Sequence, residues 1–163
     1  KRMAIGKIDY YVGALLSYLI KKKITPAIFD NSDHYKIVTF ETNERKFNLF
    51  VKYSAKPVSQ NKTSNRWDIT FTTSEYEILK NSYPKGEYEN LVVLVCSTEK
   101  FSQTEIAVLK LKQVFKCLGN DNVNQNRKIS VKSEKGSKYL RCYGTAVSSD
   151  NSLQITRNVD KQF

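Results

Sequence analysis

Histidine and cysteine are scarce in this chain of 163 residues. It has one histidine, His34, and three cysteines, Cys96, Cys117 and Cys142, none of them in a CxxC pair. A zinc site needs several such ligands close together, and a catalytic triad needs a histidine base. Neither is expected here. Each cysteine stands in an apolar or strand-like stretch, which is typical of a buried free thiol and favours a reducing, cytoplasmic environment.

Long apolar runs and glycine-rich loops are also absent. The longest apolar run, residues 91–96, has the length of a strand and falls far short of the roughly 18 residues of a membrane span. Asp9, Tyr10 and Tyr11 interrupt the apolar residues near the start, so no signal peptide and no insertion into a membrane are expected. The six glycines form no phosphate-binding loop, which excludes a nucleotide hydrolase of that type.

Positive charge is what the sequence has in excess. Lysine and arginine number 27 against 16 aspartate and glutamate residues, a formal net charge of +11. Such an excess attracts polyphosphates through counterion release, so DNA or RNA is the favoured partner. Two alternatives stay open. The charge can serve as a solvated surface alone, or it can meet an acidic protein or a membrane surface.

Periodicity in the first half predicts a helix followed by strands. Apolar residues at helical spacing indicate an amphipathic helix over about residues 7–23. The following residues are predicted to be extended, and the capping-box pattern Ser74-x-x-Glu77 predicts a short helix to about Ser82. The polar segment 55–66 is expected to be a mobile loop carrying Lys56, Lys62 and Arg66. The predicted strands are residues 27–29, 35–41, 46–54 and 67–72.

The second half predicts a buried strand, a strand with a helix, and a terminal hairpin. Residues 91–96 are continuously apolar, as expected of a central strand covered on both faces. Residues 106–109 indicate another strand before a helix over 111–118, although Ser102-x-x-Glu105 also allows one helix from 103 to 118. Residues 120–126 are a polar linker. Strands are predicted at residues 129–132, 138–143 and 153–156.

These elements predict one α/β (α+β) domain over residues 1–163. We expect a mixed, mainly antiparallel sheet flanked by helices, with a core of about residues 7–119. A basic C-terminal hairpin over about residues 127–157 would follow the core.

Residues 47–54, Phe-Asn-Leu-Phe-Val-Lys-Tyr-Ser, read as a strand that carries a lysine near its end. A helix and two strands precede it, and a helix and a strand follow. This succession, over roughly residues 8–97, resembles the core of the restriction-endonuclease-like, PD-(D/E)xK, superfamily. The resemblance implies an acid at the end of one strand and a (D/E)xK motif on the next. These residues hold Mg²⁺ and activate water for phosphodiester hydrolysis.

The sequence departs from the family pattern at one position that matters. Phe50 stands two residues before Lys52, where the family has a carboxylate, so the resemblance implies a degenerate core. Glu41 and Asp68 are candidates for relocated metal ligands beside Lys52, with Mg²⁺ as the cofactor. Asp30 and Asp33 are other nearby acids, in a pattern typical of a turn.

The C-terminal hairpin carries the clearer binding signal. Alternation places Lys128 and Lys132 on one face of the first strand and Ile129 and Val131 on the other. The returning strand places Tyr139, Arg141 and Tyr143 on one face, and Lys135 and Lys138 stand near the turn. Cations beside aromatic rings suit a ribbon inserted into a DNA groove or a platform for single strands. An ordinary half-buried hairpin with a solvated basic face is the alternative.

Three hypotheses about function follow. The first is a nucleic-acid-binding domain with a nuclease-like, degenerate core, which binds DNA or RNA through segment 55–66, Lys52 and the C-terminal hairpin. The second is a Mg²⁺-dependent endonuclease of restriction or repair type that uses Glu41, Asp68 and Lys52. The third is a protein-interaction subunit of a defence or mobile-element complex.

Overall fold

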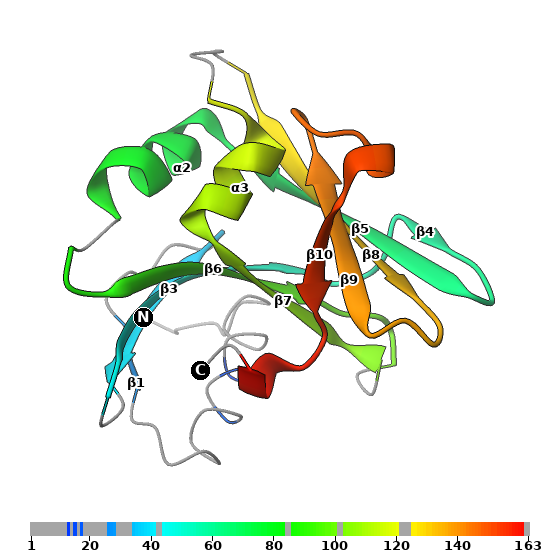
Figure 1. Cartoon of the computed structure of the whole chain (residues 1–163), viewed down its shortest axis with the longest axis horizontal. Helices are drawn as coiled ribbons and strands as arrows, with labels where there is room; N and C mark the ends of the chain where they lie inside the picture. Colours follow the sequence, from blue (N-terminus) through cyan, green and yellow to red (C-terminus); the bar gives the residue numbers. More distant parts are fainter. Residues whose placement is uncertain are drawn as a thin grey trace, which may run out of the picture.

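Two five-stranded β-sheets packed against each other form the framework of the molecule in the computed structural model (Figure 1). The structure describes residues 13, 15, 17, 26–28, 34–41, 44–83, 86–100, 103–120 and 125–161. Its main elements are β1 (Pro26–Ile28), β2 (Lys36–Glu41), β3 (Lys46–Ser54), β4 (Ser59–Gln60), β5 (Ser64–Phe71), α2 (Thr73–Glu77), the π-helical turn η1 (Ile78–Ser82), β6 (Glu89–Cys96), β7 (Glu105–Lys110), α3 (Leu111–Leu118), β8 (Arg127–Glu134), β9 (Tyr139–Gly144) and β10 (Leu153–Thr156). The α+β class is confirmed, but the expectation of one sheet is wrong.

Sheet A has the order β1-β2-β3-β6-β7 and contains the one parallel pair among the described strands. β3 and β6 run parallel in register from Phe47 opposite Glu89 to Ser54 opposite Cys96. Parallel neighbours need a long crossover connection, and here it contains β4, β5 and α2. β6 is apolar from Leu91 to Cys96 because both faces of this central strand are covered there.

Sheet B has the order β10-β9-β8-β5-β4 and is antiparallel throughout. The predicted C-terminal hairpin exists as β8 and β9, but it is not an appendage. β8 pairs with β5 over eight residues, from Ser64 opposite Glu134 to Phe71 opposite Arg127. The mobile loop expected over 55–66 is wrong in part, because β4 and the start of β5 pair as a hairpin there.

Helices α2 and α3 cover one end of the interface between the sheets. Thr72 caps α2, with Glu75 completing the capping box, so the predicted box at Ser74 and Glu77 is wrong by two residues. Strand β7 followed by α3 confirms the first of the two alternatives for residues 103–118. Tyr76 of α2 and Phe115 of α3 meet edge to face, and Figure 1 shows the two helices side by side.

Sheet A contributes to two hydrophobic clusters, one on each face. Phe50, Val92 and Leu94 point toward sheet B, α2 and α3, where Trp67 and Val131 pack against them. Leu49, Val93 and their neighbours form the second cluster with Leu15 on the opposite face. One sheet thus joins both cores.

Most of the helix predicted over 7–23 lies outside the described residues, and so do Asp30 and Asp33. Within the predicted range, residues 13, 15 and 17 are described, and all three are helical.

Candidate nucleic-acid interface

The side of sheet B that faces away from the core carries polar and aromatic side chains. Alternation buries Trp67, Ile69 and Val131 and turns their neighbours outward. We call this surface the outer face. It is formed by Arg66, Asp68 and Thr70 of β5, Lys128, Ser130, Lys132 and Glu134 of β8, Tyr139, Arg141 and Tyr143 of β9, and Gln154 of β10.

Three cations of the outer face form one row across three adjacent strands. Lys132 lies directly opposite Arg66 on one side and Arg141 on the other, so the polar faces of the three strands are aligned. Directly opposed side chains have Cβ atoms only about 4.5–5.5 Å apart, and like charges in such pairs destabilise a sheet. A bound polyanion would remove that repulsion.

Two carboxylates partly balance the cations. Asp68 Oδ2 lies 3.6 Å from Lys128 Nζ, and Asp68 Oδ1 lies 3.5 Å from Arg66 Nε and accepts a 2.7 Å hydrogen bond from Ser130 Oγ. Glu134 lies 3.6 Å from Lys132. Arg141 forms no ion pair with any residue that the structure describes. The outer face therefore keeps a net positive charge, with Arg141 as its least compensated group.

Two tyrosines flank Arg141 on the same face of β9. Tyr139 is 47% exposed, which makes it one of two large hydrophobic side chains that stand out among the described residues. Tyr143 is half-buried, opposite Ser130. Exposed aromatic rings beside arginine provide flat surfaces on which nucleobases stack.

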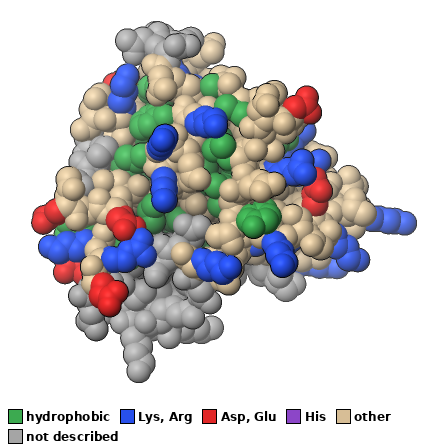
Figure 2. Space-filling view, in the orientation of Figure 1, with side chains coloured by type: hydrophobic (Ala, Val, Ile, Leu, Met, Phe, Trp, Pro, Cys, Tyr) green, Lys and Arg blue, Asp and Glu red, His purple; other side chains and the backbone are tan. Residues whose placement is uncertain are grey.

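Most of the remaining predicted binding lysines lie at the tips of the hairpins of sheet B. Lys135 and Lys138 are exposed around the β8–β9 turn, and Lys62 is exposed in the β4–β5 turn. Lys56 is exposed just before β4. In the view of Figure 2, Lys and Arg side chains are spread over the face in view, and several lie on the right over the strands of sheet B.

The predicted catalytic set does not come together. Glu41 lies opposite Lys46 at the start of β3, whereas Lys52 lies one residue beyond Val51, which faces Lys36. Six residues of strand between Lys46 and Lys52 correspond to about 20 Å. Glu41 is exposed and lies 3.9 Å from Lys46. It is thus at the wrong end of the sheet to share a metal ion with Asp68 beside Lys52.

Lys52 is a buried structural group and not an accessible cation, which corrects its predicted role in binding. It is 6% exposed and donates hydrogen bonds to the Thr70 carbonyl at 2.7 Å and to Glu75 Oε2 at 2.5 Å. Burial lowers the pKa of Lys52 from its ordinary value, and the bond and charge of Glu75 oppose that shift. Glu75 also accepts the Thr72 amide hydrogen, so both its oxygens are used.

Lys52 and Asp68 do line one shallow hollow of about 250 Å³, together with His34. No group of three histidine, cysteine or acidic side chains able to hold a metal ion occurs within the described ranges. Among its described lining residues the hollow offers one carboxylate, Asp68, and that carboxylate is occupied by Ser130, Arg66 and Lys128. These contacts give no support to a Mg²⁺ site there.

Sequence reasoning did not identify the part that β5 plays in the site. Arg66 is predicted as a nucleic-acid contact on a mobile loop and Asp68 as a metal ligand, whereas the structure places both on β5 in the outer face. The signal was the alternation of Arg66, Asp68 and Thr70 with buried aromatic and aliphatic residues. Glu75 was missed as the partner of Lys52 because contacts between distant segments leave no local pattern.

Comparisons with protein-family models, with curated proteins and with solved structures find no match for this chain. In the part of the chain that the structure describes, no helix has the length and apolar character needed to cross a membrane.

Proposed function

We propose that this protein binds single-stranded DNA or RNA on the outer face of sheet B. The observation that carries the proposal is the row of Arg66, Lys132 and Arg141 in register across three strands, with Tyr139 and Tyr143 on the same face. The cations would contact phosphates, and the tyrosine rings would stack on bases.

The width of sheet B favours a single strand over a duplex groove. Five strands at about 4.8 Å spacing make a surface about 19 Å wide. The major groove of B-DNA is only about 12 Å wide and admits a helix or a two-stranded ribbon. β8 and β9 are not such a ribbon, since β5 and β10 flank them. An open sheet face with exposed aromatic residues instead suits bases that are splayed out.

A restriction-endonuclease-like origin of sheet A is a further part of the proposal. It is supported by the β1–β2–β3 meander and by the parallel β3–β6 pair, whose connection contains α2. Catalysis by such a core is not part of the proposal, because Glu41 lies far from Lys52 and both oxygens of Glu75 already accept hydrogen bonds within the protein. We therefore propose a binding module with a degenerate core.

Charge reversal on the outer face tests the proposal. Lys132→Glu together with Arg141→Glu should weaken binding of a labelled single-stranded oligonucleotide at least tenfold and flatten its salt dependence. The matched control is Lys112→Glu with Lys116→Glu, which changes the net charge equally on α3, away from the outer face. The control should bind within about twofold of the wild type, because charges far from the outer face contribute little to the binding affinity if the strand lies on that face.

The same assay separates the other hypotheses. Binding should be measured to single- and double-stranded DNA and RNA, with Mg²⁺ and with EDTA. Cleavage that requires Mg²⁺ would identify a nuclease and contradict the degenerate core. Equal losses in both charge-reversal variants would show that the outer face is not the binding surface. No binding to any nucleic acid would leave an acidic protein as the partner to test.

A further inference from the structure

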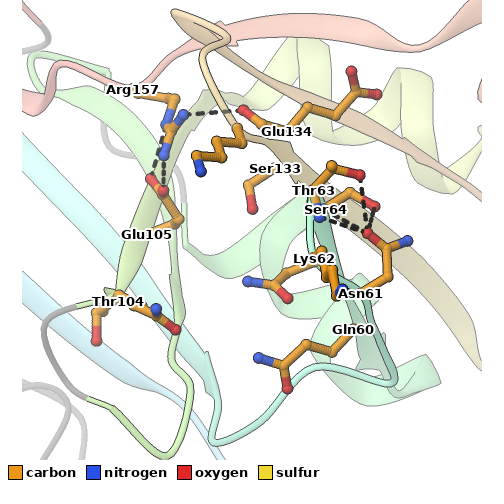
Figure 3. A pocket seen from close by; sticks show the side chains of 13 residues that line it. Gln60, Asn61, Lys62, Thr63, Ser64, Thr104, Glu105, Ser133, Glu134 and Arg157 are labelled. Carbon is orange, nitrogen blue, oxygen red and sulfur yellow. Dashed lines mark hydrogen bonds and ion pairs between the residues drawn. The ribbon is translucent and has the colours of Figure 1, made fainter.

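A polar cleft of about 450 Å³ opens beside the tips of the two hairpins of sheet B (Figure 3). We call it the tip cleft. The β4–β5 turn forms one wall, the end of β8 forms another, and Glu105 at the start of β7 lies across from them. The two hairpins that line it are those whose strands carry the outer face. A nucleic-acid strand that leaves the outer face over these tips would meet the cleft.

The walls of the tip cleft are held in place by groups whose hydrogen bonds are already made within the protein. Arg157 forms a two-pronged ion pair with Glu105 and donates to the carbonyl oxygens of Glu134 and Ser137, the latter at 2.8 Å. The Lys135 amide donates to the Thr63 carbonyl at 2.7 Å and joins the two hairpin tips. Arg157 therefore braces the cleft and has little capacity left for a ligand.

Three groups of the tip cleft remain available to a ligand. Asn65 Oδ1 is buried and accepts no hydrogen bond, which is unfavourable unless a ligand or water supplies a donor. The side chains of Lys62 and Lys135 are exposed, and neither forms an ion pair with a described residue. The cleft thus combines one buried acceptor with two free cations.

This combination matches a nucleotide that ends in a phosphate. A terminal phosphate monoester carries about −1.5 to −2 charges, whereas an internal phosphodiester carries one. Two ammonium groups complement the monoester better than the diester. The sugar hydroxyls and base amino groups of a nucleotide can donate to Asn65 Oδ1, and the volume of the cleft is in the range of small-ligand sites.

We propose that the tip cleft binds the phosphorylated terminal nucleotide of a single strand that lies on the outer face. This inference rests on the proposed function and adds a preference for one kind of end. The amide and hydroxyl groups that line most of the cleft would contact the sugar and the base by hydrogen bonds, since none of its described lining residues is aromatic.

The test uses the full chain and three fluorescent oligonucleotides of one sequence. One carries a terminal phosphate at each end, one carries hydroxyls, and one is circular. The phosphorylated strand should bind about tenfold more tightly than the other two. Lys62→Ala with Lys135→Ala should abolish that preference and leave binding of the circular strand within about twofold. Asn65→Leu, which removes the buried acceptor, should also reduce the preference.

The matched control is Lys56→Ala with Lys138→Ala, an exposed lysine just before β4 and one in the β8–β9 turn, neither of which lines the cleft. It should keep the end preference. Wild-type protein that binds all three strands equally would overturn the inference and leave the proposed function intact. An equal loss for all strands in the Lys62 and Lys135 variant would place these lysines in the general binding surface. Failure of the wild type to bind any strand would overturn the proposed function itself.

Discussion

At the scale of single residues, the clearest feature is the buried pair of Lys52 and Glu75. Both side chains are nearly inaccessible, and each also bonds to a backbone group: Lys52 donates to the Thr70 carbonyl, and Glu75 accepts from the Thr72 amide. The pair connects β3 to the start of α2. A lysine that reads as catalytic in the sequence is therefore part of the framework that positions β5 beside β3.

Removing one partner of this pair should be costly. Lys52→Met should lower the free energy of unfolding by roughly 3–5 kcal/mol, because Glu75 is then a buried charge without a counter-ion. Lys52→Met combined with Glu75→Gln should recover most of the loss, since glutamine is neutral and still accepts the Thr72 amide hydrogen. Urea denaturation measures both changes. A single variant as stable as the wild type would show that the pair contributes little.

Because three thiols are buried, the free energy of unfolding should depend on pH in the alkaline range. Burial raises the pKa of Cys117 from 9.0 to about 11, and burial likewise raises the pKa of Cys96 and of Cys142. The folded chain then keeps protons that the unfolded chain releases, so stability present below pH 9 is lost as pH rises toward 11. Lys52 acts in the opposite direction below pH 10.5, because its pKa is lowered.

This sign is testable with one substitution. Cys117→Ala should reduce the slope with which the free energy of unfolding falls between pH 9 and pH 11. A Lys112→Ala control, at an exposed site on α3, should leave that slope unchanged. Urea denaturation at a series of pH values provides the measurement. An unchanged slope in Cys117→Ala would mean that its thiol titrates alike in the folded and unfolded states.

At the scale of elements, glycine at the end of β9 controls how closely β8 and β9 approach. A Cβ atom on Gly144 would lie 2.2 Å from the Lys128 carbonyl oxygen and 3.1 Å from that of Cys117. Both obstacles are backbone atoms, which cannot rotate away. β8 carries Lys128 and Lys132, so the spacing of the two strands also sets the spacing of the outer face.

Gly144→Ala should therefore lower the free energy of unfolding by about 1–3 kcal/mol, as overpacking does in tight interiors. It should also weaken oligonucleotide binding, since β8 and β9 would separate near Tyr143. Gly136→Ala is the matched control, because its Cβ meets no atom within 4 Å and only the positive φ of +84° is unfavourable. It should cost about 1 kcal/mol and leave binding intact. A Gly144 variant equal to the Gly136 variant in both assays would contradict this role.

The sequence predicted strands better than it predicted their partners. β3 and β10 have the predicted bounds, because alternation and turn residues are local signals. The pairing of β5 with β8 joins residues that are 56 to 70 positions apart, and no local pattern encodes it. The β4–β5 hairpin was missed since its residues are polar and do not alternate. The sequence predicted only part of the cation row. Lys132 and Arg141 belong to one hairpin, which local signals predict, whereas Arg66 comes from another hairpin and reaches the row through the long-range pairing of β5 with β8.

At the scale of the whole molecule, the two sheets divide the work. Sheet A is covered on both faces by apolar clusters and provides stability. Sheet B has one face in the core and one face in solvent, and its solvent face collects cations from three strands. The net charge of +11 belongs to the whole chain, so it differs from the charge that a ligand on the outer face would meet.

The salt dependence of binding distinguishes the two. For single strands, the logarithm of the association constant falls with the logarithm of salt concentration with a slope of about −0.7 for each phosphate neutralised. Contacts from Arg66, Lys128, Lys132 and Arg141 predict a slope of about −3, and the Lys132 and Arg141 reversal should reduce it to about −1.5. If the whole excess of charge acted instead, the slope would be about −8. Affinities measured by fluorescence anisotropy over a salt series give this slope directly. A value near −3 would confine binding to the outer face, and a value near −8 would mean that the chain attracts nucleic acid through its diffuse charge without a defined site.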